Sequence, residues 1–448
     1  MTRRVPAPAS CAGIAAGSSR PRPCIETPGG RATLTGYLGT VEQKVTPQGR
    51  TLRVLVFGAD RPGVTAALFA EIERHAGAPG ALVVADVEQI VLRGRLVLGV
   101  LLTAPADWDE GGLRQGLHRW GVEWKLDVEV KAGVGDNQPR RAGRSRVTVL
   151  GAPLSPSALG RMAEVLAGAG GNIDRIVRLA KYPVTAIELD VSGIDPLELR
   201  RLLAPTAAAC GADVAVQRAG LARRAKHLIV MDVDSTLIQD EVIELLAGHA
   251  GCLAEVASVT EQAMRGELDF AASLKARVAL LEGLSDEVFD KVREQVRYTP
   301  GARTLVRTLK RLGFQVGIVS GGFTQITDHL AADLGLDYAA ANTLEVLDGR
   351  LTGRVVGPIV DRPGKAAALR GFAEAAGVPL SETVAIGDGA NDLDMLAAAG
   401  LGVAFNAKPV VRAQADTAVN VPFLDTILFL LGIPGEEVEE LAEAGAGD

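Results

Sequence analysis

The segment His227-Leu228-Ile229-Val230-Met231-Asp232-Val233-Asp234-Ser235-Thr236 decides the fold of the second half of the chain. It begins with a short apolar run that ends in acidic residues, which is typical of a buried strand. Similar apolar runs recur at 315–319, 383–386 and 402–405, and stretches with a helical pattern separate them. Buried strands that alternate with helices predict an α/β fold with a doubly wound parallel sheet. In such sheets, ligands bind beyond the carboxyl ends of the strands.

Polar residues follow each of the first three strands. Asp232 and Asp234 stand two positions apart, so an extended backbone directs both carboxylates to the same side. An Asp-x-Asp pair alone fits a helix N-cap as well as it fits chemistry, and the other strand ends decide between the two. Those ends supply a hydroxyl-bearing glycine turn, a second acidic cluster and a lysine between them, namely Ser320-Gly321-Gly322, Gly387-Asp388-Gly389-Ala390-Asn391-Asp392 and Lys365.

Together these residues predict a site for a phosphate and a magnesium ion. Carboxylate oxygens suit Mg²⁺, which is often bound by protein carboxylates and a substrate phosphate together. The amides of a glycine turn can face an anion. One aspartate is then available as a nucleophile. Lys365 taken alone would be interpreted as an exposed helix residue. It is not a P-loop lysine, because Ile359 replaces the first glycine and Ala366 replaces Ser or Thr.

The order of these motifs resembles that of the haloacid dehalogenase-like phosphohydrolases, a superfamily with a Rossmann-like sheet, over residues 226 to about 434. The chain is similar to the phosphoserine phosphatase family in particular, because it also carries Glu241, Met264, Phe270 and Arg277. The resemblance implies hydrolysis of O-phospho-L-serine to L-serine, the last step of serine biosynthesis, through an aspartyl-phosphate intermediate. The resemblance implies that Asp232 is the nucleophile and Asp234 the general acid/base. It implies that Asp232, the main-chain carbonyl of Asp234 and Asp388 hold Mg²⁺, with support from Asp392. The implied substrate contacts come from Glu241, Met264, Phe270, Arg277, Ser320, Gly321, Lys365 and Asn391.

Residues 239–299 form a predicted helical insertion beside the phosphate site, and such an insertion can act as a cap that excludes water. Glu241 could bind the ammonium group of an amino acid, and Arg277 could bind its carboxylate as a bidentate fork. Each residue also has a simpler interpretation. Glu241 suits the first turn of a helix, Arg277 could be solvated, and Met264 and Phe270 could belong to the core.

Two earlier segments each show the order βαββαβ, which predicts a duplicated ferredoxin-like module. Both segments resemble ACT domains, which commonly pair edge to edge and bind an amino acid. The turn residues Asp60 and Gly63 in the first unit, and Gly171, Asn172 and Asp174 in the second, are candidate regulatory residues for an effector such as serine. These glycines could equally close turns without a ligand. Edge pairing suggests a homo-oligomer, with a dimer favoured, although the two units could pair within one chain.

Length and composition are consistent with this organisation. A chain of 448 residues predicts about three domains, and 48% hydrophobic residues suffice to bury several cores. The net charge of 47 minus 54, or -7, offers no basic field for nucleic acid, and no apolar run is long enough to span a membrane. Four scattered cysteines, Cys11, Cys24, Cys210 and Cys252, favour a reducing cytoplasm.

The predicted boundaries are a disordered tail over 1–48, ACT-like domains over 49–135 and 143–220, a phosphatase domain over 225–434 and an acidic tail over 435–448. An organelle transit peptide is a rival interpretation of the Arg-rich N-terminal segment. Two functional alternatives stay open. The same catalytic core could hydrolyse or transfer the phosphate of another small phosphomonoester, or the chain could be an amino-acid-responsive regulatory protein with a vestigial phosphatase half.

Overall fold

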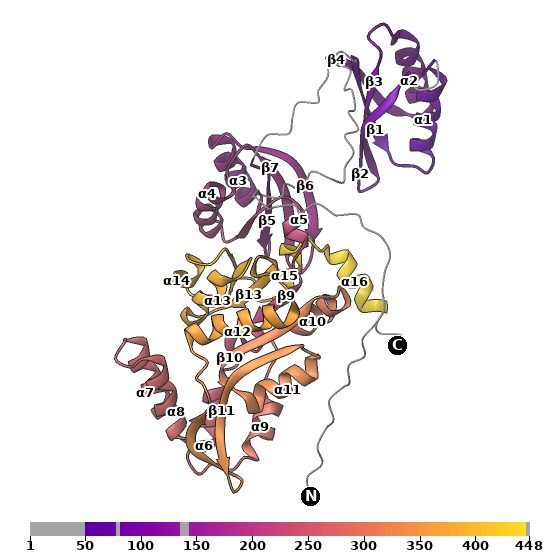
Figure 1. Ribbon diagram of the computed structural model, residues 1–448. Helices are drawn as coiled ribbons and strands as arrows, with labels where there is room; N and C mark the ends of the chain where they lie inside the picture. The colour runs from indigo at the N-terminus through magenta and orange to yellow at the C-terminus, as the bar shows by residue number, and fades with distance from the viewer. Residues whose placement is uncertain (1–49, 78–80, 135–142, 445–448) are drawn as a thin grey trace, which may run out of the picture. The chain divides into compact units, whose positions relative to one another are not determined.

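The computed structural model describes residues 50–77, 81–134 and 143–444 (Figure 1). The predicted N-terminal tail therefore lies outside the described residues. The chain divides into two compact units, residues 1–138 and 139–448, and each is described by itself. In the described part of the chain, no helix has both the length and the apolar character needed to cross a bilayer.

The first unit is a four-stranded antiparallel sheet in the order β2-β3-β1-β4, with two helices on one face (Figure 1). Alternate residues of β1, such as Leu52, Val54 and Val56, are fully buried against the helices, as the period of two predicted. The elements are β1 (Arg50–Ala59), α1 (Val64–Arg74), β2 (Val83–Leu92), β3 (Arg95–Ala104), α2 (Gly111–Trp124) and β4 (Leu126–Val134). This order confirms the predicted βαββαβ module.

The second unit begins with another module of the same kind, whose sheet has the order β6-β7-β5-β8. Its helices start at side chains that cap them, since Ser155 accepts a hydrogen bond from the Ala158 amide and Asp195 accepts one from the Leu197 amide. The elements are β5 (Ser145–Gly151), α3 (Pro156–Gly168), β6 (Asn172–Ala180), β7 (Thr185–Ser192), α4 (Pro196–Ala209) and β8 (Asp213–Arg218), followed by the short helix α5 (Leu221–Arg224).

A seven-stranded sheet forms the rest of the second unit, in the order β12-β11-β10-β9-β13-β14-β15. Leu228 and Val230 of β9 face one layer of helices, while Ile229 and Met231 face the other. The sheet is therefore covered on both sides, as predicted for a doubly wound fold. Its strands are β9 (Leu228–Met231), β10 (Gln315–Phe323), β11 (Tyr338–Leu347), β12 (Arg350–Val356), β13 (Thr383–Gly387), β14 (Gly402–Phe405) and β15 (Thr417–Val419).

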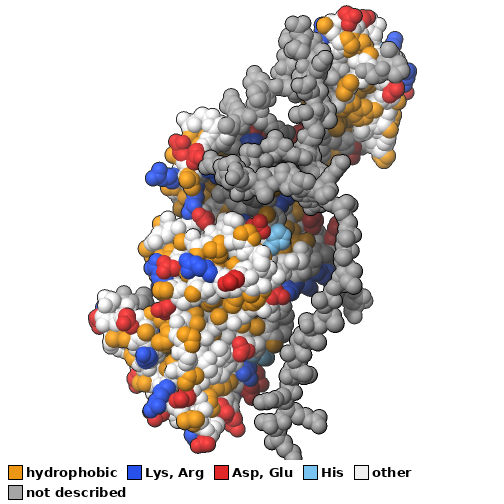
Figure 2. Space-filling view, in the orientation of Figure 1, with side chains coloured by type: hydrophobic (Ala, Val, Ile, Leu, Met, Phe, Trp, Pro, Cys, Tyr) orange, Lys and Arg blue, Asp and Glu red, His pale blue; other side chains and the backbone are white. Residues whose placement is uncertain are grey.

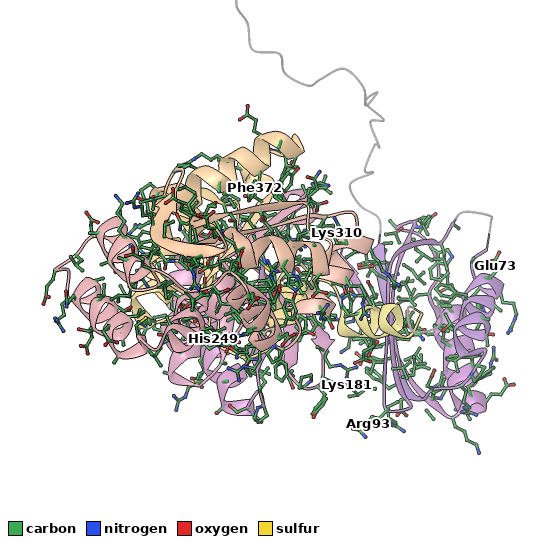
Figure 3. The ribbon with its side chains drawn as sticks, turned by 90° about the horizontal axis from the view of Figure 1, so that it is seen from below. Glu73, Arg93, Lys181, His249, Lys310 and Phe372 are labelled. Atoms are coloured by element: carbon green, nitrogen blue, oxygen red, sulfur yellow. The ribbon has the colours of Figure 1, made fainter. Side chains whose placement is uncertain are left out.

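The helices of this sheet lie in two layers. Phe372 projects from α12 (Figure 3) and stacks on the Tyr338 ring of β11 with centroids 5.0 Å apart, which fixes that layer to the sheet. The helices are α10 (Ala302–Arg311), α11 (Thr324–Leu334), α12 (Arg362–Ala376), α13 (Leu393–Ala398), α14 (Pro409–Arg412) and α15 (Ile427–Leu430). Three strands, β11, β12 and β15, were not among the predicted runs, and β12 is antiparallel to β11.

The insertion after β9 is helical, as predicted, and forms a cap (Figure 1). A β-bridge between Ile238 and Tyr298 closes its base. The cap helices are α6 (Val242–Ala250), α7 (Leu253–Met264), α8 (Phe270–Ala279) and α9 (Val288–Gln295).

The second βαββαβ module shares a hydrophobic core with the seven-stranded sheet. The face of its sheet opposite α3 and α4 contributes Leu150 and Ala186 to the same buried cluster that contains Leu428 and Leu430. Polar contacts join the two parts as well. Arg223 pairs with the buried Glu188 of β7 at 2.5 Å and donates to the Leu430 carbonyl. The second module is therefore a built-in part of the second unit.

The acidic C-terminal segment forms a helix whose glutamates between positions 436 and 440 are exposed. Helix α16 (Gly435–Ala444) packs Val438 against the core cluster, and Glu436 lies 3.3 Å from the Arg178 guanidinium of β6. The apolar position within this acidic segment explains why it docks. Residues 445–448 lie outside the described part.

Candidate active site

The two aspartates after β9 face one cavity of about 390 Å³ between the sheet and the cap. The Val233 amide donates to Asp232 at 2.8 Å. Asp234 accepts from the Val242 amide at 2.8 Å through one oxygen and from the Ser320 hydroxyl at 2.9 Å through the other. Burial raises the pKa of the Asp234 carboxyl despite these hydrogen bonds. A raised pKa favours the protonated carboxyl, which is the form that a general acid needs.

Lys365 lies between two carboxylates at the floor of this cavity. Its Nζ is 2.6 Å from an oxygen of Asp232 and 2.6 Å from an oxygen of Asp392, and its side chain is only 1% exposed. Burial alone would lower its pKa, but the two carboxylates outweigh burial and raise it, so the ammonium stays charged. The side chain of Asp361 caps α12 and so fixes the turn that carries Lys365. Lys365 is therefore not the exposed helix residue that its isolated position in the sequence suggested.

Three carboxylates form a cluster that could hold a metal ion. Asp232, Asp388 and Asp392 offer oxygens that all lie within 4.8 Å of one another. Burial and the charge of Asp392 raise the pKa of Asp388 to about 6, and the same two causes raise that of Asp232. Lys365 supplies one positive charge against this crowded acidic set. The residues present therefore fit a hard divalent cation, which would stabilise their ionised forms.

The predicted glycine turn is a bulge in β10. Its hydroxyl is fully buried, since Ser320 is 0% exposed, donates to Asp234 and accepts from the Gly322 amide at 2.7 Å. Gly321 and Gly322 line the cavity. The bulge thus brings backbone close to the carboxylates without any intervening side chain.

The cap closes the cavity with Glu241, Phe270 and Arg277. The Ser235 hydroxyl donates to Glu241 at 2.8 Å, and burial, with the nearby Asp234 charge, raises the pKa of Glu241 to about 7. The Arg277 guanidinium is partly buried, and burial lowers its pKa. Among the described residues, no carboxylate lies within ion-pair distance of it. Arg277 is therefore available to an anion in the cavity.

The two remaining predicted residues are Asn391 and Met264. Asn391 lines the cavity from the 3₁₀ turn Ala390–Asp392. Met264 ends α7, and its side chain lies outside the described part of the structure. The cavity thus contains or borders every predicted catalytic, metal and substrate residue for which a side chain is described.

Comparisons with known proteins agree with this arrangement. The haloacid dehalogenase-like hydrolase family matches residues 229–397, and ACT domain families match residues 50–131 and 144–217. A phosphoserine phosphatase of Streptomyces coelicolor is 65% identical over 389 residues, which cover 87% of this chain and 94% of that protein. The chain belongs to the phosphoserine phosphatase family.

Other members of the phosphoserine phosphatase family support the same assignment. A relative from Mycobacterium tuberculosis is 52% identical over 406 residues, covering 88% of this chain and 95% of its own length. The crystal structure of a probable phosphoserine phosphatase from Vibrio cholerae is 38% identical and aligns with a TM-score of 0.53, over 64% of this chain and 86% of that one. The family matches confirm the predicted combination of a Rossmann-like hydrolase domain with two ACT domains.

The candidate regulatory residues of this phosphoserine phosphatase family member lie in the ACT domains, and none of them is among the residues that line the cavity. Gly63 precedes α1 with φ of 92°, a left-handed conformation that favours glycine. In the second ACT domain, Asn172 donates to Asp174 at 2.6 Å, and a side chain at Gly171 would collide with Ile194. The Asp60 amide donates to the Gly94 carbonyl at 2.8 Å. Each residue thus has a structural use in its turn, and a ligand role stays a prediction.

The structure adds residues to the site that sequence reasoning did not single out. Thr236 is fully buried and donates to Asp388 at 3.2 Å, and Ser235 holds Glu241 from a left-handed conformation with φ of 59°. Both follow the Asp-x-Asp motif directly, so their position was a usable signal. Thr260 lines the cavity from α7, and no signal in its helical context distinguishes it.

Proposed function

We propose that this protein is a magnesium-dependent phosphatase that hydrolyses O-phospho-L-serine to L-serine and phosphate. One observation carries the proposal: a single cavity joins the Asp232 and Lys365 pair at its floor to Glu241 and Arg277 at its cap. The floor suits a phosphate, and the cap offers an anion for an ammonium group and a cation for a carboxylate. The names of the relatives from Streptomyces and Mycobacterium support this substrate.

In the first proposed step, an oxygen of Asp232 attacks the phosphorus atom, and the bond from phosphorus to the serine oxygen breaks. Asp234 gives its proton to the departing serine oxygen, consistent with the raised pKa of its carboxyl. Lys365 and the amides of the β10 bulge stabilise the charge on the phosphoryl oxygens. Magnesium held by Asp232, the Asp234 carbonyl and Asp388, with Asp392 in support, would supply further charge neutralisation.

In the second proposed step, water attacks the phosphorus of the aspartyl-phosphate and Asp234 accepts a proton from that water. The bond between phosphorus and the Asp232 oxygen breaks, which releases inorganic phosphate and restores the carboxylate. The same residue thus acts first as acid and then as base. The hydrogen bonds from Ser320 and the Val242 amide hold Asp234 in place for both proton transfers.

The direct test is phosphate release from a panel of phosphorylated metabolites, with Mg²⁺ present or chelated by EDTA. We expect phosphoserine to be the best substrate and chelation to abolish its turnover. Asp232→Asn should abolish turnover while the circular dichroism spectrum stays unchanged. A clear preference for another phosphomonoester would contradict the substrate assignment, and substantial activity of Asp232→Asn would contradict the nucleophile.

We further propose that serine binds at the ACT domains and lowers activity, and that the protein, in the cytoplasm, forms a homodimer. The edge strand β2 supports dimerisation, because Val87 and Ile90 are 47% and 59% exposed on a strand with one unpaired edge. Figure 2 shows hydrophobic side chains at the surface of this first unit. Light scattering should report a dimer that Val87→Lys weakens, and a wild-type monomer would contradict the proposal.

Regulation by serine can be separated from simple product inhibition. Product binding in the active site competes with phosphoserine, whereas an effector at the ACT domains should lower the maximal rate. We expect Asp60→Ala and Asn172→Ala to weaken the second effect without changing the rate in the absence of serine. Inhibition that is purely competitive, and unchanged in both variants, would argue against an ACT-domain site.

A further inference from the structure

The bulge in β10 interrupts the pairing between β10 and β11. Val319 pairs with Ala340 and Phe323 pairs with Asn342, so three residues of β10 stand opposite the single residue Ala341. Such a bulge removes its residues from the ladder and leaves their backbone groups without strand partners. The Gly322 amide of the bulge donates to the Ser320 hydroxyl, and Gly321 lines the cavity. The carbonyl groups of the bulge, however, need another partner if they are buried.

Asn342 provides that partner. Its side chain is 0% exposed, and its Nδ2 donates to the Gly321 carbonyl at 2.8 Å. Its Oδ1 accepts from the Val360 amide, also at 2.8 Å. A carbonyl on one side and an N–H on the other leave a single orientation of the amide that satisfies both. Asn342 therefore bridges two loops of the backbone.

The two bridged loops both lead to the floor of the cavity. Gly321 lines the cavity. Val360 precedes Asp361, the N-cap residue of α12, which is the helix that carries Lys365. The loops are also adjacent, because a side-chain carbon added at Gly321 would lie 3.9 Å from the Val360 carbonyl oxygen. A small shift of either loop would change the distance between the bulge amides and the Lys365 ammonium. The bridge thus connects the two loops whose separation sets this distance.

We infer that Asn342 is a positioning residue, which holds the 320–322 bulge and the Lys365 helix at the separation that a transferring phosphoryl group requires. The inference rests on the proposed phosphatase activity. Asn342 does not line the cavity, so it acts through Gly321 and Val360 rather than by touching substrate. It should therefore affect the chemical step for any phosphomonoester, and it should hardly affect recognition of the serine moiety by Glu241 and Arg277.

The test compares Asn342→Leu with the wild-type protein on phosphoserine and on p-nitrophenyl phosphate. The leucine has a similar volume but makes neither hydrogen bond. We expect kcat to fall about 10- to 100-fold on both substrates by a similar factor, the size of effect that a misplaced reacting group produces. KM for phosphoserine should change by less than about threefold, because the cap contacts are intact.

The control for a merely structural effect is Leu344→Ala, two residues along the same strand and also buried. It leaves a cavity and should lower the melting temperature, yet kcat well below melting should stay close to wild type. An equal loss of kcat in Leu344→Ala and Asn342→Leu would overturn the inference. So would an unchanged kcat in Asn342→Leu, or a loss confined to phosphoserine.

Asn342→Asp keeps the size of the side chain and the bond from the Val360 amide, and it serves if the leucine variant does not fold. Only a protonated carboxyl can donate to the Gly321 carbonyl, so its activity relative to wild type should recover as the pH is lowered. A ratio that is independent of pH would contradict the role of that hydrogen bond. If the wild-type protein prefers the aryl phosphate, the proposed substrate fails, but the kcat ratios on that ester still decide the role of Asn342.

Discussion

Replacing Lys365 by methionine should destabilise the protein far more than removing an exposed lysine. The ammonium is 1% exposed and lies 2.6 Å from oxygens of both Asp232 and Asp392. At an effective dielectric constant of about 20, each contact corresponds to a gross attraction of about 6 kcal/mol. Desolvation offsets much of this attraction. Removing one partner of a buried ion pair nevertheless costs about 3–5 kcal/mol, because the remaining charges are left unpaired.

Lys310 gives a matched control for this experiment. Figure 3 labels Lys310. Its Nζ lies the same 2.6 Å from an oxygen of Asp337, but the two side chains are 34% and 30% exposed. Solvent screening reduces such a pair to about 0–1 kcal/mol. Urea denaturation of Lys365→Met and Lys310→Met should therefore give well-separated midpoints, and phosphate release should be lost in the first variant only.

The difference should also depend on pH. Without the ammonium, the pKa of the Asp232 carboxyl in the folded state should rise further above its unfolded value. The folded variant then binds more protons than the unfolded chain as the pH falls, so its stability deficit should shrink as the pH is lowered from about 8. Mg²⁺ should stabilise Lys365→Met more than wild type. A deficit at pH 8 no larger than that of Lys310→Met would refute the electrostatic reasoning.

Three further outcomes test the cap and the bulge. Arg277→Ala should raise KM for phosphoserine at least tenfold and leave p-nitrophenyl phosphate turnover nearly unchanged, and equal losses on both would argue against a carboxylate-binding role. The pKa of Glu241 is about 7, and only its ionised form can pair with an ammonium group. The value of kcat/KM for phosphoserine should therefore fall as the pH drops below about 7. The same pH profile for an ester without an amino group would count against this pairing. Gly321→Ala places a methyl group 3.0 Å from the Phe270 ring, so turnover should fall severalfold, whereas wild-type kinetics would mean that the cap yields easily.

The sequence predicted the parts of the site that follow buried parallel strands. Asp232, Ser320 and Asp388 all come directly after apolar runs, and parallel strands bring their carboxyl ends to one edge. Lys365 was predicted to lie in the site only because it occurs together with the motifs at the strand ends. Its own sequence context resembles that of an exposed helix residue. Its burial depends on Asp392, which lies 27 residues away in the chain.

Other features depend on contacts that no local pattern records. Asn342 lies within a strand whose half-buried residues do not alternate cleanly, so neither β11 nor its bridging amide could be inferred. The short strand β15 has three residues and a helix-like context, which hides it from periodicity. The docking of α16 likewise involves Val438, an apolar residue in an acidic segment.

The core that the second ACT domain shares with the phosphatase sheet bears on how far the chain can be dissected. Cutting before the phosphatase domain would strip the cover from Leu428 and Leu430 and leave the Leu430 carbonyl without its Arg223 donor. A phosphatase shortened in that way would lose activity for reasons unrelated to an effector. The dissectable boundary lies near residue 138, between the two compact units. Each ACT domain has a core between its sheet and its helices, but the second also shares a core on the other face of its sheet with the phosphatase sheet. The first ACT domain can therefore be removed more safely than the second.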